Sequence, residues 1–435
     1  MKKILSLILL LLVFLSLVSC KDNTNVTKAD IDYTISIKNE LSEVAKREER
    51  KCFNFFYATA NTDENSGGYG LIPDRYPSNG LSSIASVGFG LTAIPIGIEN
   101  GWISKENGYE RVLKTFDTLD RITTVHGFYY HFYNEKTGFV ASGSEVSNID
   151  TSILLCGALF CGEYFGDLIK ERAQEIYDRV EWTWFLKSNN QFAMSATSNG
   201  TLSGAWNHYA EQLMMYFLGA GSNTYPINKK VYDSFTKQKV NYEGYEIIYS
   251  WFGSIFTYQF SHAWIDFRKI LDPNGIDYYK NSENATMANY LYCQKNKSIY
   301  KGFDKGWGLT ACDGPDGYSG LYGASPSGSN STSHRTDGTI PPCGAIGSIC
   351  FAPELVLETM DYYYNLFDGK LFGGYGFYDA YNMENGVWIA TDVIGIDKGI
   401  SLLMLENYQS EFVWNVFMNC DFMSKAIKTL GFTYR

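Results

Sequence analysis

Carboxylic acids stand directly before several apolar stretches of this sequence, where they are candidates for acid–base chemistry. Glu145 precedes Ser147-Asn148-Ile149-Asp150, which leads into a run of small and apolar residues. Ser147 followed three residues later by Asp150 is typical of a capping box, and the helix dipole favours an acid there. Asp150 therefore has a structural interpretation beside the chemical one. Glu145 precedes the cap, next to glycine turns and an aromatic run, and we expect it to line a cleft.

A third carboxyl lies in the stretch WNHYAEQLMM. Glu211 has apolar neighbours, among them Ala210, Leu213 and Met214. An isolated buried carboxylate is costly, so we expect Glu211 either to have a partner or to face a wet cleft. Hydrolysis of a glycosidic bond needs one carboxylic acid to protonate the leaving oxygen and a second carboxylate to activate water or attack the sugar. The chain supplies several candidates for both roles.

Further acidic and aromatic residues lie at the starts of expected buried helices or in long loops: Trp206, Tyr209, Trp307, Asp313, Asp316, Asp379, Trp388, Asp392 and Asp397. Asp313 and Asp316 in CDGPDG are also typical turn formers, and their spacing lacks the alternating oxygen donors of a calcium loop. Asp397 in GIDKG is equally a candidate helix cap. The histidines show no HExxH spacing, and no GxSxG, P-loop or βαβ GxGxxG motif occurs. We therefore predict neither a metal nor a cofactor.

The first residues read as a targeting segment. Two lysines, an apolar run and Leu17-Val18-Ser19 precede Cys20, so we assign residues 1–19 to a signal peptide. The pattern resembles a bacterial lipobox, which implies a lipidated Cys20, a polar tether over residues 20–36 and a location in the cell envelope, in the periplasm or at the surface. A transmembrane anchor needs about 20 apolar residues and fits less well.

Charge and composition restrict the partners. The formal net charge is -11, and removal of residues 1–19, with Lys2 and Lys3, makes the chain more acidic. An acidic surface argues against nucleic acid. Aromatic residues make up 16% of the chain, and such rings suit sugar faces as well as core packing. We expect the remaining cysteines to be mostly reduced and buried, and Cys343 with Cys350 is the first pair to test for a disulfide.

Apolar and amphipathic helices alternate along residues 37–435. The stretches 83–98, 149–165, 206–218 and 396–405 are apolar on nearly all sides, whereas 37–60, 104–119, 167–185 and 353–367 carry charge on one face. A doubly wound α/β fold would need periodic strands between these helices. The alternation instead predicts one all-α domain, an (α/α)6 barrel with two concentric rings of helices and long loops on one face.

Six sequence blocks, in order, resemble one family. They are SIASVGFGLTAIPIGIENGWIS, HGFYYHFYNEKTGFVASGSEVSNIDTSILLCGAL, WGLTACDGPDGYSGLYG, GSICFAPE, YGFYDAYN and GIDKGISLLMLENY. The chain from about residue 47 to 432 is similar to the glycoamylase-like family of endo-β-1,2-glucanases (glycoside hydrolase family 144) and cyclic β-1,2-glucan synthase C-terminal domains. The resemblance implies an (α/α)6 barrel, a sugar-binding cleft and inverting hydrolysis of β-1,2-glucan by a monomeric envelope enzyme.

The resemblance also implies roles for individual residues. Glu211 is the expected general acid, Asp397 the first choice for the base and Asp392 the second, with Glu145 and Asp150 as acids of the cleft. The residues expected to bind sugar are Asp74, Arg75, Trp206, Tyr209, Trp307, Asp313, Asp379 and Trp388. Two alternatives stay open: an exo-acting glucosidase or glucoamylase-like hydrolase on another glucan, and a surface glycan-binding lipoprotein without turnover.

Overall fold

The computed structural model describes residues 33–328 and 333–435. The chain divides into a unit from Met1 to Thr34 and a unit from Ile35 to Arg435, and the second contains the helices and strands described below. The predicted signal peptide, Cys20 and most of the predicted tether lie outside the described residues. Within the described ranges, no helix combines the length and the apolar character needed to cross a bilayer.

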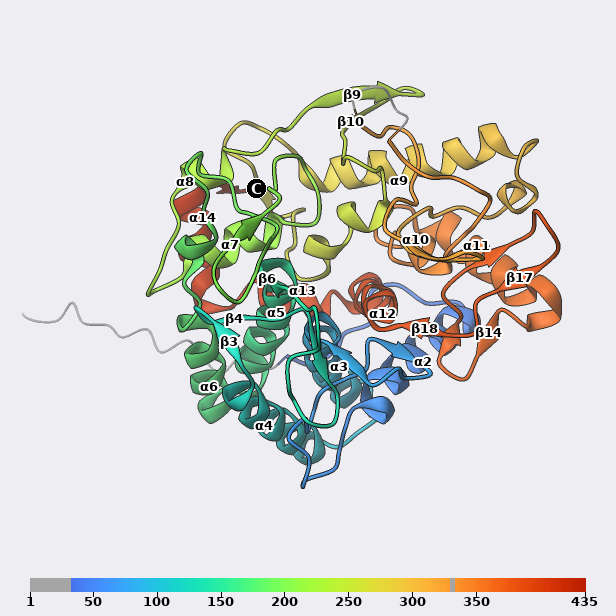
Figure 1. The fold of residues 1–435 in the computed structure, drawn as a ribbon. Coiled ribbons are helices and arrows are strands. Elements are labelled where there is room, and N and C mark those ends of the chain that lie inside the picture. Colours follow the sequence, from blue (N-terminus) through green and yellow to red (C-terminus); the bar gives the residue numbers. More distant parts are fainter. Residues whose placement is uncertain (1–32, 329–332) are drawn as a thin grey trace, which may run out of the picture. The chain divides into compact units, whose positions relative to one another are not determined.

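Helices dominate the unit and are of two kinds (Figure 1). The first kind is apolar and buried on nearly every side, and comprises α3 (Ile84–Glu99), α5 (Asn148–Phe165), α7 (Leu213–Gly221), α10 (Pro342–Ile346) and α12 (Gly395–Ser410). Glycines allow α3 and α5 to approach closely, because a Cβ on Gly157 would lie 2.1 Å from the carbonyl oxygen of Gly88. These helices form the centre of the unit.

The second kind of helix is amphipathic and packs its apolar face on the buried helices. These helices are α2 (Glu43–Thr59), α4 (Lys105–Arg121), α6 (Asp167–Asp178), α9 (Tyr278–Asn296), α11 (Pro353–Asn365) and α14 (Asp421–Leu430). Ser42 and Ser104 cap α2 and α4 by accepting backbone N–H groups of the first turn. α2 packs on α3 and α12, α6 packs on α5, and α14 packs on α7.

The strands among the described residues are two to four residues long and serve mainly to fix loops. Three of them lead directly into buried helices. β2 (Leu81–Ser83) pairs with β5 (Phe132–Asn134) before α3, β6 (Val146–Ser147) pairs with β7 (Ser195–Ala196) before α5, and β18 (Val393–Ile394) pairs with β1 (Arg75–Tyr76) before α12. Residues distant in sequence are thereby held together at one end of the helices.

The prediction of a helix-rich domain is confirmed, with one local correction. The stretch 206–218 is not one helix, because the backbones of His208 and Tyr209 form bridges with Thr236 and Ser250, and α7 begins only at Leu213. The stretch 249–270 contains two short 3₁₀ helices, η2 (Ile255–Tyr258) and η3 (Phe260–Ala263).

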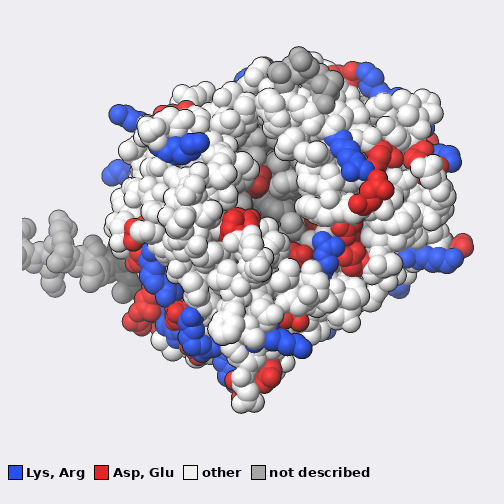
Figure 2. All heavy atoms as spheres, in the orientation of Figure 1, with Lys and Arg blue, Asp and Glu red and all other residues white. Residues whose placement is uncertain are grey.

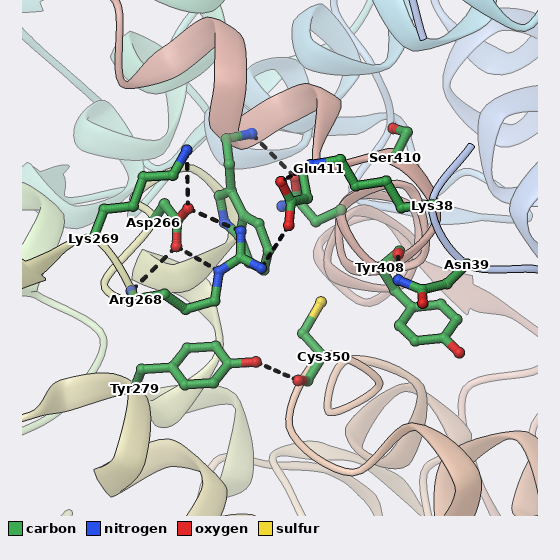
Figure 3. Close-up of polar contacts among 12 residues, drawn as sticks. Lys38, Asn39, Asp266, Arg268, Lys269, Tyr279, Cys350, Tyr408, Ser410 and Glu411 are labelled. Atoms are coloured by element: carbon green, nitrogen blue, oxygen red, sulfur yellow. Dashed lines mark hydrogen bonds and ion pairs between the residues drawn. The ribbon is translucent and has the colours of Figure 1, made fainter. Parts of the chain in front are cut away.

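The N-terminal segment of the unit is fastened at the C-terminal end of α12. The Lys38 backbone N–H donates to the Gln409 carbonyl at 2.7 Å, and the Lys38 ammonium pairs with Glu411. Arg268 donates to Glu411 at 2.7 Å and to Asp266 at 2.8 Å, which continues the network (Figure 3). With 16 residues, α12 is about 24 Å long, so this network lies far from the first residues of the helix.

The eight cysteines of the described ranges are free thiols, and seven of them are buried. Cys343 lies beside Asp397, whereas the Cys350 thiol donates to the Met404 carbonyl at 3.4 Å. The two cysteines that the sequence singled out as a possible disulfide therefore have different partners.

Candidate active site

Two adjoining cavities of about 640 and 520 Å³ open on the molecule, each within the usual range for ligand sites. Both are lined by Met194, Trp206, Glu211 and Phe256, so they form one continuous cleft with Glu211 at the junction. Figure 2 shows a hollow in the middle of this face, with acidic side chains in and beside it.

The two halves of the cleft differ in chemistry. The half that we call the acidic lobe is lined by titratable and polar groups, among them Asp74, Arg75, His131, Glu145, Asp150 and Tyr318. The half that we call the aromatic lobe is lined mainly by rings, among them Trp206, His208, Trp251, Phe252 and Phe256. Trp251 is 41% exposed and packs against the His208 ring at 4.8 Å between centroids. One lobe can bind hydroxyls through charge, and the other offers apolar ring faces.

Glu211 is held rigidly just before α7. The Ser261 hydroxyl donates to the Glu211 carbonyl oxygen at 2.6 Å and accepts the Met214 N–H at 3.0 Å, which ties this backbone to η3. Burial, with a smaller contribution from the charge of Asp150, raises the pKa of Glu211 from 4.5 to about 7. A carboxyl with this pKa is protonated in a large fraction of molecules near neutral pH, as a general acid requires.

Asp150 lies in the first turn of α5 and has a place in the cleft as well. Its backbone N–H donates to the Ser147 hydroxyl at 3.2 Å, so Ser147 caps α5, and the same hydroxyl donates to the Asp150 carboxylate at 2.5 Å. The carboxylate also lines the acidic lobe. Its position at the helix start is therefore compatible with a position in the cleft.

Glu145 lies beside a histidine that sequence analysis did not consider. His131 Nδ1 is 2.9 Å from Glu145 Oε1, and His131 Nε2 is 3.9 Å from Asp150 Oδ2. The hydrogen bond from His131 lowers the pKa of Glu145. Burial opposes a charge on His131, but Asp150, Glu145 and Asp74 outweigh it and raise the pKa of His131 to about 9. The acidic lobe therefore contains a cation among its carboxylates.

Arg75 organises a second group of acids at the edge of the acidic lobe. Its guanidinium is 2.9 Å from Asp313 and 2.7 Å from Asp392, and 3.4 Å from Asp74. Asp392, the second choice for the base, does not line the cleft and is held in this ion pair. A carboxylate occupied by Arg75 is not free to activate water, so the structure disfavours that prediction for Asp392.

Asp397, the first choice for the base, does not line the cleft either. It is 5% exposed and faces Asp379, which is 3% exposed, and the Cys343 thiol. Burial raises the pKa of Asp397 to about 6, and burial together with Asp397 raises the pKa of Asp379. Asp379 also accepts the Asp313 N–H at 2.7 Å. Tyr318 of the acidic lobe lies next to this pair.

Two of the four aromatic residues predicted to stack on sugar have buried rings. Trp307 is fully buried and donates its indole N–H to Thr359 at 2.8 Å. Tyr209 lines the aromatic lobe but is 1% exposed, with its ring against those of Tyr258 and Tyr278. Trp388 is half-buried, packs on a small buried cluster and lines neither lobe. Trp206 lines both lobes, is 6% exposed and donates its indole N–H to Asn148.

The exposed rings of the cleft are instead Trp251, Phe252 and Tyr318. Their signal in the sequence was weak, because nothing distinguishes them from the many aromatic residues that form the core. Asp316, considered for a calcium loop, points to Arg335 at 3.4 Å. Within the described ranges no cluster of three His, Cys, Asp or Glu side chains is arranged to hold a metal ion.

Comparison with known proteins shows the family of this chain. A family model named Glycoamylase, described as "Putative glucoamylase", matches residues 203–421, half of the chain. The chain belongs to the glycoamylase family. The matched range contains Glu211 and the aromatic lobe from His208 to Phe256, but not the acidic residues before position 203.

Two solved structures are similar over nearly their whole length. The structure of a putative glucoamylase from Bacteroides uniformis is 29% identical, with a TM-score of 0.82 over 91% of this chain and 99% of that one. An endo-β-1,2-glucanase from Chitinophaga pinensis, solved with sophorotriose and glucose, is 28% identical, with a TM-score of 0.81 and the same coverage.

A curated relative is an exo β-1,2-glucooligosaccharide sophorohydrolase (non-reducing end) from Parabacteroides distasonis. It is 26% identical over 419 residues, which cover 87% of this chain. The aligned part spans only 56% of that relative's own length.

Proposed function

We propose that this protein is a glycoside hydrolase that cleaves β-1,2-glucan. The observation that supports it best is Glu211, a carboxyl with a pKa near 7 at the junction of an acidic and an aromatic lobe. A sugar chain that runs through both lobes would place a glycosidic oxygen next to this acid. The substrate follows from the relatives described as acting on β-1,2-glucan or its oligosaccharides, with similarity along most of the chain.

In the reaction that we propose, protonated Glu211 gives its proton to the glycosidic oxygen as the C1–O bond breaks. A water molecule attacks C1 from the opposite face of the ring and loses its proton to Asp150. Asp150 suits the role of base because its carboxylate lines the cleft, where it accepts the Ser147 hydroxyl at the start of α5. Asp397 is the second candidate, next to Tyr318 of the acidic lobe.

The displacement that we propose is a single one with inversion. No hydrogen bond joins Glu211 to Asp150 in the described part of the chain, and single displacement needs room for a water between acid and base. Nuclear magnetic resonance of the first product would show the α-anomer of the new reducing end. A β-anomer as the first product would contradict inversion.

We propose an internal, endo-acting mode of cleavage, because substrate-lining residues continue on both sides of Glu211. The similarity to the Parabacteroides enzyme supports a second candidate, release of disaccharides from the non-reducing end. The time course on linear β-1,2-glucan separates them. Endo cleavage gives a mixture of lengths from the start, whereas exo cleavage gives sophorose alone while the polymer length falls slowly.

The test of the proposed function uses a panel of β-1,2-, β-1,3-, β-1,4- and α-1,4-glucans with products read by chromatography. We expect turnover of the β-1,2 polymer and a loss of about 10²–10⁴-fold in kcat for Glu211→Gln. Glu175→Gln, an exposed residue of α6, is the matched control and should keep full activity. Binding of β-1,2-glucan without turnover would point to a glycan-binding protein, and no response to any glucan would refute the proposal.

We also infer that the helices form an (α/α)6 barrel. The buried helices follow the order α3, α5, α7, η2 with η3, α10 and α12, and α12 packs on α3 as the closing contact. The amphipathic helices α2, α4, α6, α14, α9 and α11 would form the outer ring. An experimental structure in which α12 and α3 are apart would contradict this arrangement.

Finally, we propose that the protein is a monomeric envelope lipoprotein anchored through Cys20. Support comes from the lipobox-like sequence that ends at Cys20. A palmitate analogue should label the wild type but not Cys20→Ala, and equal labelling of both would refute the lipid anchor. Light scattering of the purified protein measures its mass and so tests whether it is a monomer.

A further inference from the structure

We propose that His131 is a positioning residue, which keeps Glu145 charged and holds Glu145 and Asp150 in place opposite Glu211. This inference rests on the proposed function for the roles of Asp150 and Glu211. The contacts of His131 themselves are a property of the structure and can be measured without a substrate.

Four contacts hold His131, two through its backbone and two through its imidazole ring. Its backbone N–H donates to the Glu145 carbonyl at 2.9 Å, and its own carbonyl accepts the Ile84 N–H at 3.0 Å. The ring stacks on Phe132 with centroids 3.7 Å apart and planes 21° from parallel. Nδ1 lies 2.9 Å from Glu145 Oε1. The ring has little freedom to turn away from the acids.

Both ring nitrogens face carboxylates, which a neutral imidazole cannot satisfy. A neutral ring has one N–H donor and one bare nitrogen, whereas the imidazolium has two donors. Nδ1 is at hydrogen-bond distance from Glu145, and Nε2 is 3.9 Å from Asp150, within ion-pair distance. In the neutral form, one bare nitrogen would point at a negative oxygen. The geometry therefore selects the charged ring.

The charged groups around His131 come from three segments. Asp74 and its neighbour Arg75 lie at β1, Glu145 precedes β6, and Asp150 belongs to the first turn of α5. Arg75 is engaged by Asp313 and Asp392, which leaves His131 as the cation next to Glu145 and Asp150. Glu211 lines the same lobe, but no cation contributes to the shift of its pKa. One histidine thus separates the acids into charged and protonated members.

Loss of the charge at position 131 should move the acid limb of the pH–activity profile. Without the imidazolium, Glu145 binds its proton more tightly, because the His131 hydrogen bond is what lowers its pKa, so the acid limb of the profile moves to higher pH. No cation contributes to the pKa of Glu211, so the alkaline limb should stay in place. An opposite charge at this distance is worth about one pKa unit or more. A purely structural role would lower the rate equally at every pH.

The chain provides a matched control in His126. His126 Nδ1 lies 2.8 Å from Glu181, and its ring stacks on Trp184 with centroids 4.6 Å apart. This is the same combination of carboxylate and aromatic face, but neither His126 nor Glu181 lines the cleft. His126→Gln therefore reports the cost of losing such a pair outside the site.

The experiment compares His131→Gln with His126→Gln in two measurements. The acid limb of the pH dependence of kcat on β-1,2-glucan should shift upward by about one unit in His131→Gln and stay unchanged in His126→Gln. Nuclear magnetic resonance of the imidazoles in the wild type should show His131 titrating well above the usual value of about 6.5, and Asp150→Asn should lower its pKa. This second measurement needs neither turnover nor the folding of His131→Gln.

The outcomes separate this inference from the proposed function. An unshifted profile with a uniform loss of rate, or a His131 that titrates near 6.5, would overturn the role of His131 while leaving a hydrolase. A wild type that cleaves no glucan would refute the proposed function. The titration of His131 would still show whether its imidazole is the charged group of the acidic lobe that the structure indicates.

Discussion

Replacement of Glu211 by glutamine should stabilise the protein at alkaline pH while it abolishes turnover. The folded protein binds the Glu211 proton more tightly than the unfolded chain, because the pKa rises from 4.5 to about 7. This group therefore favours folding fully at low pH, and its contribution is lost as the pH rises through the interval from 4.5 to about 7. Glutamine keeps the shape and removes the ionisation.

The expected size follows from the shift of the pKa. Each unit corresponds to 1.36 kcal/mol, so the full shift is worth at most about 3 kcal/mol, and partial exposure of Glu211 to the cleft reduces it to about 1–3 kcal/mol. Relative to wild type, Glu211→Gln should gain that amount of unfolding free energy between about pH 4.5 and pH 8. Other buried acids titrate equally in both proteins and cancel in the difference.

Urea unfolding at both pH values measures this difference, with Glu175→Gln on the exposed face of α6 as the control. The control should show no dependence on pH beyond that of the wild type. If the stability difference between Glu211→Gln and wild type is the same at both pH values, Glu211 has an ordinary pKa. The argument that burial prepares it as a general acid would then fail.

Three further predictions concern the core, the aromatic lobe and the thiols. Glu48→Gln leaves the buried Lys398, 2.7 Å away, without its counter-charge, and should lower the free energy of unfolding in urea by about 3–5 kcal/mol. The control Glu246→Gln, in an exposed pair with Lys239, should lower it by less than about 1 kcal/mol. Equal losses in the two variants would contradict the importance of the buried pair. Trp251→Ala should weaken binding of β-1,2-glucan oligosaccharides by about 0.5–1.5 kcal/mol, measured by calorimetry, with undiminished affinity as the contrary result. Thermal unfolding should be the same with and without reductant, because the described cysteines are free thiols, and a lower melting temperature in reductant would reveal a disulfide.

The helices that sequence analysis located best are those whose local signals and tertiary environment agree. The stretch 149–165 has a serine cap and is apolar on all sides, and it is helical from Asn148 to Phe165. The stretch 206–218 is equally apolar near its end, yet only Leu213–Gly221 is helical, because the preceding residues pair with distant segments at Thr236 and Ser250. Such bridges depend on where other loops lie, which periodicity does not encode.

The same distinction between local signals and tertiary environment explains which site residues the sequence revealed and which it did not. Glu145, Asp150 and Glu211 were found because each breaks a local pattern: a carboxyl before a cap, within a cap or among apolar neighbours. Asp397 met the same criterion, but its environment is set by Asp379, a residue 18 positions earlier that no local pattern connects to it. His131 was missed because the histidines were searched only for metal-binding spacings.

The chemistry of the cleft depends on different surroundings for acids that have nearly the same intrinsic pKa. Asp150 accepts the Ser147 hydroxyl at the N-terminus of α5 and lies 3.9 Å from His131 Nε2. Desolvation and the charge of Asp150 both raise the pKa of the half-buried Glu211, which favours its protonated form. A change that neutralises Asp150 should therefore lower the pKa of Glu211. In Asp150→Asn the alkaline limb of any residual activity should move to lower pH, whereas in His131→Gln that limb should stay in place.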